Sequence, residues 1–241
     1  MKRGKRLSSA ASLARASLGL LLAPFSLAVL FAACAAFARL AARPGASAWF
    51  LAGFVGYAVL YAANVARLRP LYVLAHETTH ALAAWMGGGK VFAISVKGES
   101  GHVDLSHSSP FVALAPYWVP LYALLSVLVY RLLLWSGPPP HAREAFLALM
   151  GAALSFHLMH TAESLWVTRQ GDLEEAGTTL SLSLILLLNG LLLLAALTCL
   201  FPRTVSFGGE LARAAGWAAS FWRLLASGGE ALVRVLRSAA R

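Results

Sequence analysis

The fold is decided by a long uncharged stretch near the C-terminal end of the chain, residues 176–202, which reads AGTTLSLSLILLLNGLLLLAALTCLFP. An α-helix needs about 20 residues to cross about 30 Å of hydrocarbon, so this stretch is long enough to span a membrane. Four more stretches of at least 18 residues lack Asp, Glu, Lys and Arg, at 16–38, 44–66, 105–130 and 145–162. A membrane barrel would instead show short segments of alternating hydrophobicity. The sequence therefore predicts an all-α polytopic membrane protein.

The composition of the 241-residue chain leads to the same class. Apolar residues make up 59% and charged residues 12%, whereas soluble proteins have about 45–50% and about 25%. These values exclude a soluble globular protein, and they exclude disorder, which needs low hydrophobicity. A sixth, shorter apolar run, Leu71–Met86, is interrupted by His76, Glu77 and His80. With this run included, we expect about six transmembrane helices within residues 1–201.

The basic residues predict an orientation. With six crossings and a cytoplasmic N-terminus, 15 of the 20 Lys and Arg residues fall on the cytoplasmic side, as the positive-inside rule requires. The net charge of +10 then belongs to the flanks of the spans, so we expect no nucleic-acid partner. We expect a bacterial inner (plasma) membrane protein with both termini in the cytoplasm. Residues 1–15 and the following apolar stretch also match a signal peptide, but the stretch is long enough to span, which favours a retained first helix.

Two segments outside the apolar runs have predicted structures of their own. Gly98-Glu99-Ser100-Gly101 separates the β-prone runs Val91–Lys97 and Gly101–Ser106, which predicts a short β-hairpin after the interrupted run. The basic tail, residues 202–241, interleaves apolar residues with arginines. This pattern predicts one or two amphipathic helices lying on the inner leaflet, with a break near Ser227-Gly228-Gly229. A soluble helical hairpin is the alternative interpretation of the tail.

The polar residues of the interrupted run form the pentad HETTH at positions 76–80. Positions four apart share one face of a helix, so His76 and His80 can reach the same metal ion. Zinc lowers the pKa of the water that it activates to about 7, and Glu77 can accept that proton and give it to the departing nitrogen of an amide. Ionisable residues inside an apolar helix usually mark function. The alternative is a polar patch that forms hydrogen bonds between helices.

Residues 72–88, YVLAHETTHALAAWMGG, resemble the active-site helix of the site-2 protease (M50) family. In that family the metal motif lies within a transmembrane helix and is followed by small residues, glycines and a short β segment, so the hairpin predicted at 91–106 fits. The close resemblance covers about residues 72–106. It implies a metalloendopeptidase that cleaves membrane-anchored protein substrates, with His76 and His80 as zinc ligands and Glu77 as general base and acid.

The third metal ligand is less clearly marked. The family takes it from an aspartate within Asn-x-x-Pro-x-x-Leu-Asp-Gly, a motif that this chain lacks, and the nearest match is Gln170-Gly171-Asp172-Leu173. Asp172 is therefore the candidate, with a solvated loop charge as the alternative. With six crossings Asp172 lies near the outer end of its span, whereas His76 and His80 lie about 9 and 15 Å from the inner end of theirs.

The fifth predicted span carries a second set of polar residues. His157, His160 and Glu163 form an i, i+3, i+6 stripe near mid-membrane. The stripe either lines the catalytic cavity, completes the metal site with a histidine in place of Asp172, or forms hydrogen bonds between helices. We also expect Asn189 to make an interhelical hydrogen bond.

A non-enzymatic membrane protein is the competing functional interpretation. A transporter, metal carrier or assembly factor could retain the pentad, and the missing Leu-Asp-Gly context favours that class. A structural scaffold without metal is a third interpretation. The sequence identifies neither the substrate nor the oligomeric state. Pro116 and Pro120 predict a kink in the fourth span without a catalytic role.

Overall fold

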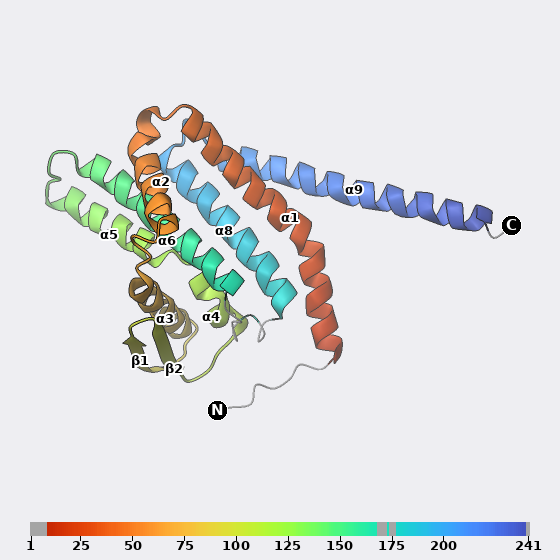
Figure 1. Ribbon diagram of the computed structural model, residues 1–241, viewed down its shortest axis with the longest axis horizontal. Helices are drawn as coiled ribbons and strands as arrows, with labels where there is room; N and C mark the ends of the chain where they lie inside the picture. The colour runs from red at the N-terminus through yellow and green to blue at the C-terminus, as the bar shows by residue number, and fades with distance from the viewer. Residues whose placement is uncertain (1–8, 168–172, 174–176, 240–241) are drawn as a thin grey trace.

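The computed structural model describes residues 9–167, 173 and 177–239. The chain is predominantly helical with one small sheet (Figure 1). In chain order the elements are α1 (Ser9–Ala42), η1 (Gly45–Ser47), α2 (Ala48–Ala62), α3 (Arg69–Met86), β1 (Val91–Lys97), β2 (Ser100–Leu105), α4 (Pro110–Leu114), η2 (Ala115–Tyr117), α5 (Leu121–Ser136), α6 (Ala142–Val167), α8 (Thr178–Leu200) and α9 (Phe207–Ala239).

Several described helices have the length and composition of membrane spans. Four qualify, namely α1, α2 together with η1, α6 and α8, and a fifth is obtained if α4–η2 and α5 count as one span bent by 72°. The helical membrane class is therefore supported, and the kink predicted at Pro116 and Pro120 is confirmed. Six crossings are not confirmed, because α3, which carries the pentad, does not qualify.

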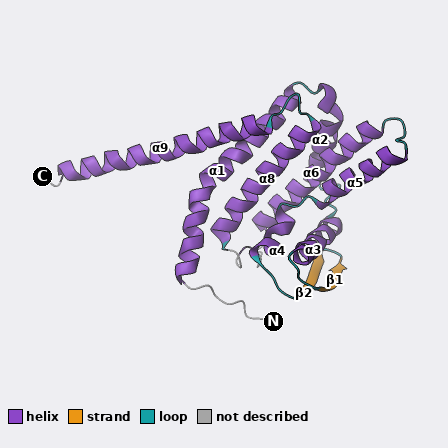
Figure 2. Ribbon diagram, turned by 180° about the vertical axis from the view of Figure 1, so that it is seen from behind, coloured by secondary structure: helices purple, strands orange, loops and turns teal. Residues whose placement is uncertain are grey.

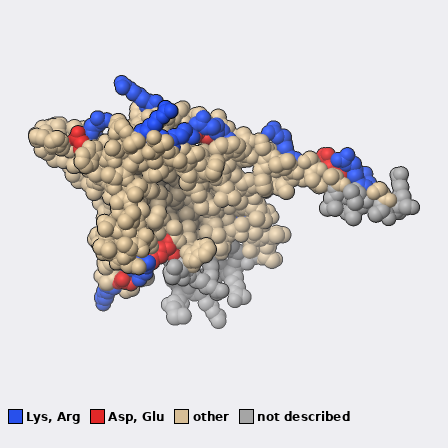
Figure 3. All heavy atoms as spheres, turned by 45° about the horizontal axis from the view of Figure 1, so that its top comes forward, with Lys and Arg blue, Asp and Glu red and all other residues tan. Residues whose placement is uncertain are grey.

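The long helices form a bundle, and α3 lies at one end of it. The β-hairpin and α4 lie at the same end, whereas α9 leaves the opposite end and extends sideways (Figures 1 and 2). Charged side chains gather near the two ends and along α9, with an uncharged belt between them (Figure 3). This distribution agrees with a bundle whose middle lies in lipid.

Glycines allow the helices of the bundle to approach closely. A Cβ atom added at Gly53 of α2 would lie 1.9 Å from the carbonyl oxygen of Ala148 in α6, and one at Gly151 of α6 would lie 2.0 Å from that of Phe50. In the α1–α8 pair, a Cβ at Gly190 would lie 2.9 Å from the backbone nitrogen of Leu30. Small residues at such contacts are typical of helix pairs in membranes, where close packing drives association.

We therefore expect Gly53→Ala to destabilise the bundle by about 1–3 kcal/mol, because the new methyl group overpacks the contact with α6. Gly56 of the same helix is the matched control, since a Cβ there meets nothing within 4 Å. Gly56→Ala should be neutral or stabilising because alanine has the higher helix propensity. Unfolding of the two variants in detergent micelles measures the difference. Equal stability of the two would contradict the close contact.

The hairpin and the tail test two local predictions. Strands β1 and β2 pair antiparallel, with Ile94 opposite Val103 and an irregularity between Val91 and Ala93, so the predicted hairpin is confirmed. The predicted break near Ser227-Gly228-Gly229 is wrong, because α9 runs through it as one helix. Each interior glycine costs about 1 kcal/mol, which a long helix tolerates. A folded-back helical hairpin is therefore excluded for the tail.

Candidate functional site

Helix α3 holds the whole pentad on continuous helical backbone. Leu68 precedes it in the left-handed conformation, with φ 47°, and Pro70 lies in its first turn. Proline suits that position because its φ is already helical and the first turn needs no N–H donor. Gly88, with φ 76°, turns the chain out of the helix towards β1. These terminal residues bring the strands back alongside α3.

The imidazoles of His76 and His80 face each other. Their Nε2 atoms lie 3.2 Å apart and share a hydrogen bond, and their ring planes are inclined by 81°. The His80 Nδ1 atom lies 2.9 Å from the carbonyl oxygen of Val112 at the start of α4. Because a carbonyl only accepts, Nδ1 carries the proton, which leaves the lone pair of the His80 Nε2 directed at His76.

This geometry fits the group that the pentad implies. Tetrahedral zinc with Zn–N bonds of about 2.0–2.1 Å sets two ligand nitrogens about 3.3–3.4 Å apart. The observed separation of 3.2 Å lies close to that value. A backbone carbonyl that holds the far nitrogen of a histidine is also a common outer-shell partner of metal ligands. The separation of the two nitrogens is therefore one at which a single ion could bind both His76 and His80.

Aromatic side chains surround His76. The ring of Tyr117, which is fully buried, meets the His76 ring edge-on at 5.4 Å between centroids, and the ring of Tyr72 lies at 5.7 Å. Tyr72 in turn stacks on His160 of α6 at 4.8 Å. These contacts restrict rotation of the His76 side chain. Neither tyrosine stands out as a site residue in the sequence, because Tyr72 has the spacing of an ordinary helix residue and Tyr117, between Pro116 and Trp118, resembles an interfacial anchor.

Glu77 faces a cleft of about 470 Å³ between α3, α6 and the hairpin. Gly101 of β2 lies directly against it, and a Cβ atom there would be 2.6 Å from the Glu77 Cγ and from the Val73 Cγ1. The backbone of Gly101 thus packs directly on the Glu77 side chain, where any larger residue would clash. The residues lining the cleft are Arg69, Tyr72, Val73, His76, Glu77, Glu99, Ser100, Gly101, His160, Glu163 and Ser164.

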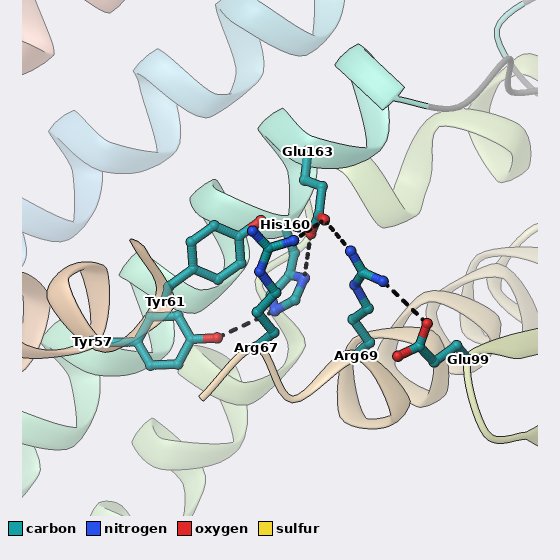
Figure 4. Close-up of polar contacts among 7 residues, drawn as sticks. All are labelled: Tyr57, Tyr61, Arg67, Arg69, Glu99, His160 and Glu163. Carbon is teal, nitrogen blue, oxygen red and sulfur yellow. Dashed lines mark hydrogen bonds and ion pairs between the residues drawn. The ribbon is translucent and has the colours of Figure 1, made fainter. Parts of the chain in front are cut away.

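An ionic network forms one wall of the cleft (Figure 4). The carboxylate of Glu163 accepts hydrogen bonds from Tyr61 at 2.6 Å, Arg69 at 2.7 Å and Arg67 at 3.1 Å. The second Nη of Arg69 donates to Glu99 in the hairpin turn at 3.1 Å. The network therefore ties together α6, the end of α2, the start of α3 and the hairpin. Neither arginine was singled out from the sequence, although a glutamate in an apolar helix signals a cationic partner.

The stripe on α6 mainly joins helices. His157 donates to the Asn189 Oδ1 of α8 at 3.2 Å, and Asn189 donates to the Tyr117 carbonyl oxygen at 2.7 Å. The interhelical hydrogen bond predicted for Asn189 is confirmed. His160 pairs with the Tyr57 hydroxyl at 3.2 Å, and both His160 and Glu163 also line the cleft. The interpretation as interhelical hydrogen bonds is therefore confirmed for His157 and His160. Two members of the stripe also line the cleft beside Glu77, and a catalytic role of that cleft stays a prediction.

The third interpretation, a metal site completed on α6, has no support in the described part of the chain. No group of three or more His, Cys, Asp or Glu side chains among the described residues could hold a metal ion. Asp172 lies outside the described residues. Its neighbour Leu173 is buried in a cluster with Tyr117 and Ile185. Asp104 pairs with His102 at 2.7 Å on the exposed surface of the hairpin.

Comparison with other proteins identifies no relative of this chain. No protein-family model, curated protein or solved structure matches the chain. The functional interpretation therefore rests on the site itself and on the resemblance of residues 72–106.

Proposed function

We propose that this chain is an intramembrane zinc metalloprotease, resembling the site-2 protease (M50) family, that hydrolyses peptide bonds of membrane-anchored proteins. The observation that carries the proposal is the convergence of the His76 and His80 Nε2 atoms at 3.2 Å, one residue from a carboxylate that faces a cleft. A bound zinc ion would polarise a peptide carbonyl and acidify a water molecule.

The residues around the ligands would prepare them for this reaction. The Val112 carbonyl fixes the tautomer of His80, and the Tyr72 and Tyr117 rings hold the orientation of His76. Glu77 would take a proton from water as the peptide carbon is attacked and return it to the leaving nitrogen. The bare backbone of Gly101 leaves the Glu77 carboxylate room to do so.

Asp172 is our proposed third ligand. Asp172 and the two histidines are separated in depth only if α3 crosses the membrane from the side opposite to Asp172. In the bundle, α3 lies at the same end as the start of α8 (Figure 1). Leu173 also shares a cluster with Tyr117, whose ring touches that of His76. A His₂Asp set leaves a fourth position open for substrate, as catalytic zinc sites require.

We infer five crossings in place of six, with α3 embedded at one end. The basic residues that follow α3 then change sides relative to the six-crossing topology. Each side of the membrane then carries ten of the twenty basic residues. The ten on the side of the N-terminus are the five in residues 1–15, Arg67, Arg69, Lys90, Lys97 and Arg169. The charge bias that placed both termini in the cytoplasm disappears, and the two termini lie on opposite sides. The bacterial plasma membrane remains our proposed location.

A cleavage assay tests the proposal. The full chain is reconstituted in proteoliposomes with a single-span model peptide that carries a fluorophore and a quencher on opposite sides of its transmembrane segment. We expect cleavage, its loss on addition of a chelator, and its return with added zinc. An intact peptide under all three conditions would contradict a protease with broad specificity for membrane-anchored segments.

Gly101→Val should reduce this cleavage by about 100-fold, because the side chain displaces either Glu77 or the hairpin, and a misplacement of about 1 Å costs that much. Ser100→Ala is the matched control, since Ser100 lines the same cleft but its hydroxyl donates to the Lys97 carbonyl within the turn. The rates of the two variants are compared at equal zinc content. Unchanged cleavage by Gly101→Val would show that β2 does not hold Glu77 in place.

A metal-binding membrane protein without protease activity is the second candidate. The observation that favours it is that the described residues contribute only two convergent ligands. A transporter, carrier or assembly factor of this kind needs the two histidines but not the base. Glu77→Gln separates the two functions.

A further inference from the structure

Helix α9 is fixed firmly where it begins. Glu210, in its first turn, is only 1% exposed, and its carboxylate pairs with Arg39 at the end of α1 and with Arg213 one turn along α9. Two guanidinium groups on one buried carboxylate hold the start of α9 against α1. These two ion pairs therefore fix the direction in which α9 leaves the bundle.

An apolar stripe continues from the packed part of α9 into its free part. Leu211, Ala214 and Ala218 follow one face and pack against the core of the bundle. The same spacing leads on to Phe221 and Leu225. These two side chains are 45% and 53% exposed, and the Phe221 ring meets that of its neighbour Trp222 edge-on.

The opposite face of the free part is basic and polar. Arg223, Ser227, Glu230 and Arg234 lie on it, and Arg237 lies at its edge. From residue 219 to 239 the helix extends for about 31 Å. It leaves the bundle near the end where α1 finishes and extends away from the other helices (Figure 1).

We propose that residues 219–239 of α9 form an in-plane anchor in the surface of the lipid bilayer. Phe221, Trp222 and Leu225 would lie at the boundary of headgroups and acyl chains, and Arg223 and Arg234 would face phosphates and water. A lipid surface is favoured over a protein partner because the stripe continues that of the segment packed on α1, a membrane-spanning helix. Arginines opposite an apolar stripe complement anionic headgroups.

The test measures depth in the bilayer, with the full chain in phosphatidylcholine vesicles containing a minor fraction of phosphatidylglycerol. Cys34 and Cys199 are first replaced by serine. A nitroxide is then attached to Leu225→Cys or, as the matched control two residues along the same helix, to Ser227→Cys. Neither side chain contributes to the packed core, so folding should be unaffected.

We expect the Leu225→Cys label to lie about 5–10 Å below the phosphates and to collide with oxygen in preference to a water-soluble nickel chelate. The Ser227→Cys label should show the reverse preference. Equal exposure of both labels to the chelate would overturn the proposal. Strong dipolar coupling between Leu225→Cys labels on two molecules would overturn it too, because a second copy would then cover the stripe. Neither outcome depends on protease activity.

Discussion

Glu77→Gln is expected to lower cleavage of the single-span model peptide by about 10²–10⁴-fold, the usual contribution of a positioned general base. Glutamine keeps the shape of the side chain and its packing against Gly101, but it cannot accept the proton. The zinc content should stay at the wild-type level, because the histidines are unchanged. A metal carrier would bind zinc equally well with either residue.

Glu230→Gln provides the control for this substitution. This substitution makes the same chemical change on the exposed part of α9. Helix α9 leaves the bundle at the end opposite to α3 (Figure 1). Its cleavage rate should match that of the wild type. If the wild type cleaves and Glu77→Gln cleaves as fast, Glu77 is not the base.

Glu163→Gln is expected to lower the free energy of unfolding by about 2–3 kcal/mol. The substitution leaves Arg67 and Arg69 close together without their shared carboxylate, and breaking a buried ion pair costs about 3–5 kcal/mol. The value expected here is smaller because solvent reaches 38% of the Arg67 side chain and 39% of Arg69. Unfolding in detergent micelles measures the change.

Tyr61→Phe refines the same test. It removes one donor to Glu163 and leaves both ion pairs, so it should cost about 0.5–1.5 kcal/mol. In combination with Glu163→Gln the two effects should be clearly less than additive, since both remove the same contact. If Glu163→Gln is as stable as the wild type, the network does not hold α3 and the hairpin on α6.

Local features of this fold can be predicted from sequence. The hairpin, the bend at Pro116 and Pro120 and the helical pentad depend on neighbouring residues, and each is found. The number of crossings depends on more than length. Leu71–Met86 is apolar enough to suggest a span, but its polar face binds the hairpin and α6, and the helix lies at one end of the bundle.

The surroundings of the site depend on contacts between distant parts of the chain. Arg67 and Arg69 meet Glu163 across 96 and 94 positions, and Tyr61 meets it across 102. No local pattern predicts such pairs. The sequence does show that Glu163 needs a partner, because an isolated charge in an apolar helix is costly. The continuity of α9 through Gly228 and Gly229 was missed for the opposite reason, since local glycine signals suggested a break.

The zinc content of the purified protein shows directly whether His76 and His80 form a metal centre. We expect one zinc ion per wild-type chain, one in Glu77→Gln, and none when His76 and His80 are both replaced by glutamine. A wild-type chain without stoichiometric zinc, or a double variant that keeps it, would contradict the claim that these two histidines form a metal centre.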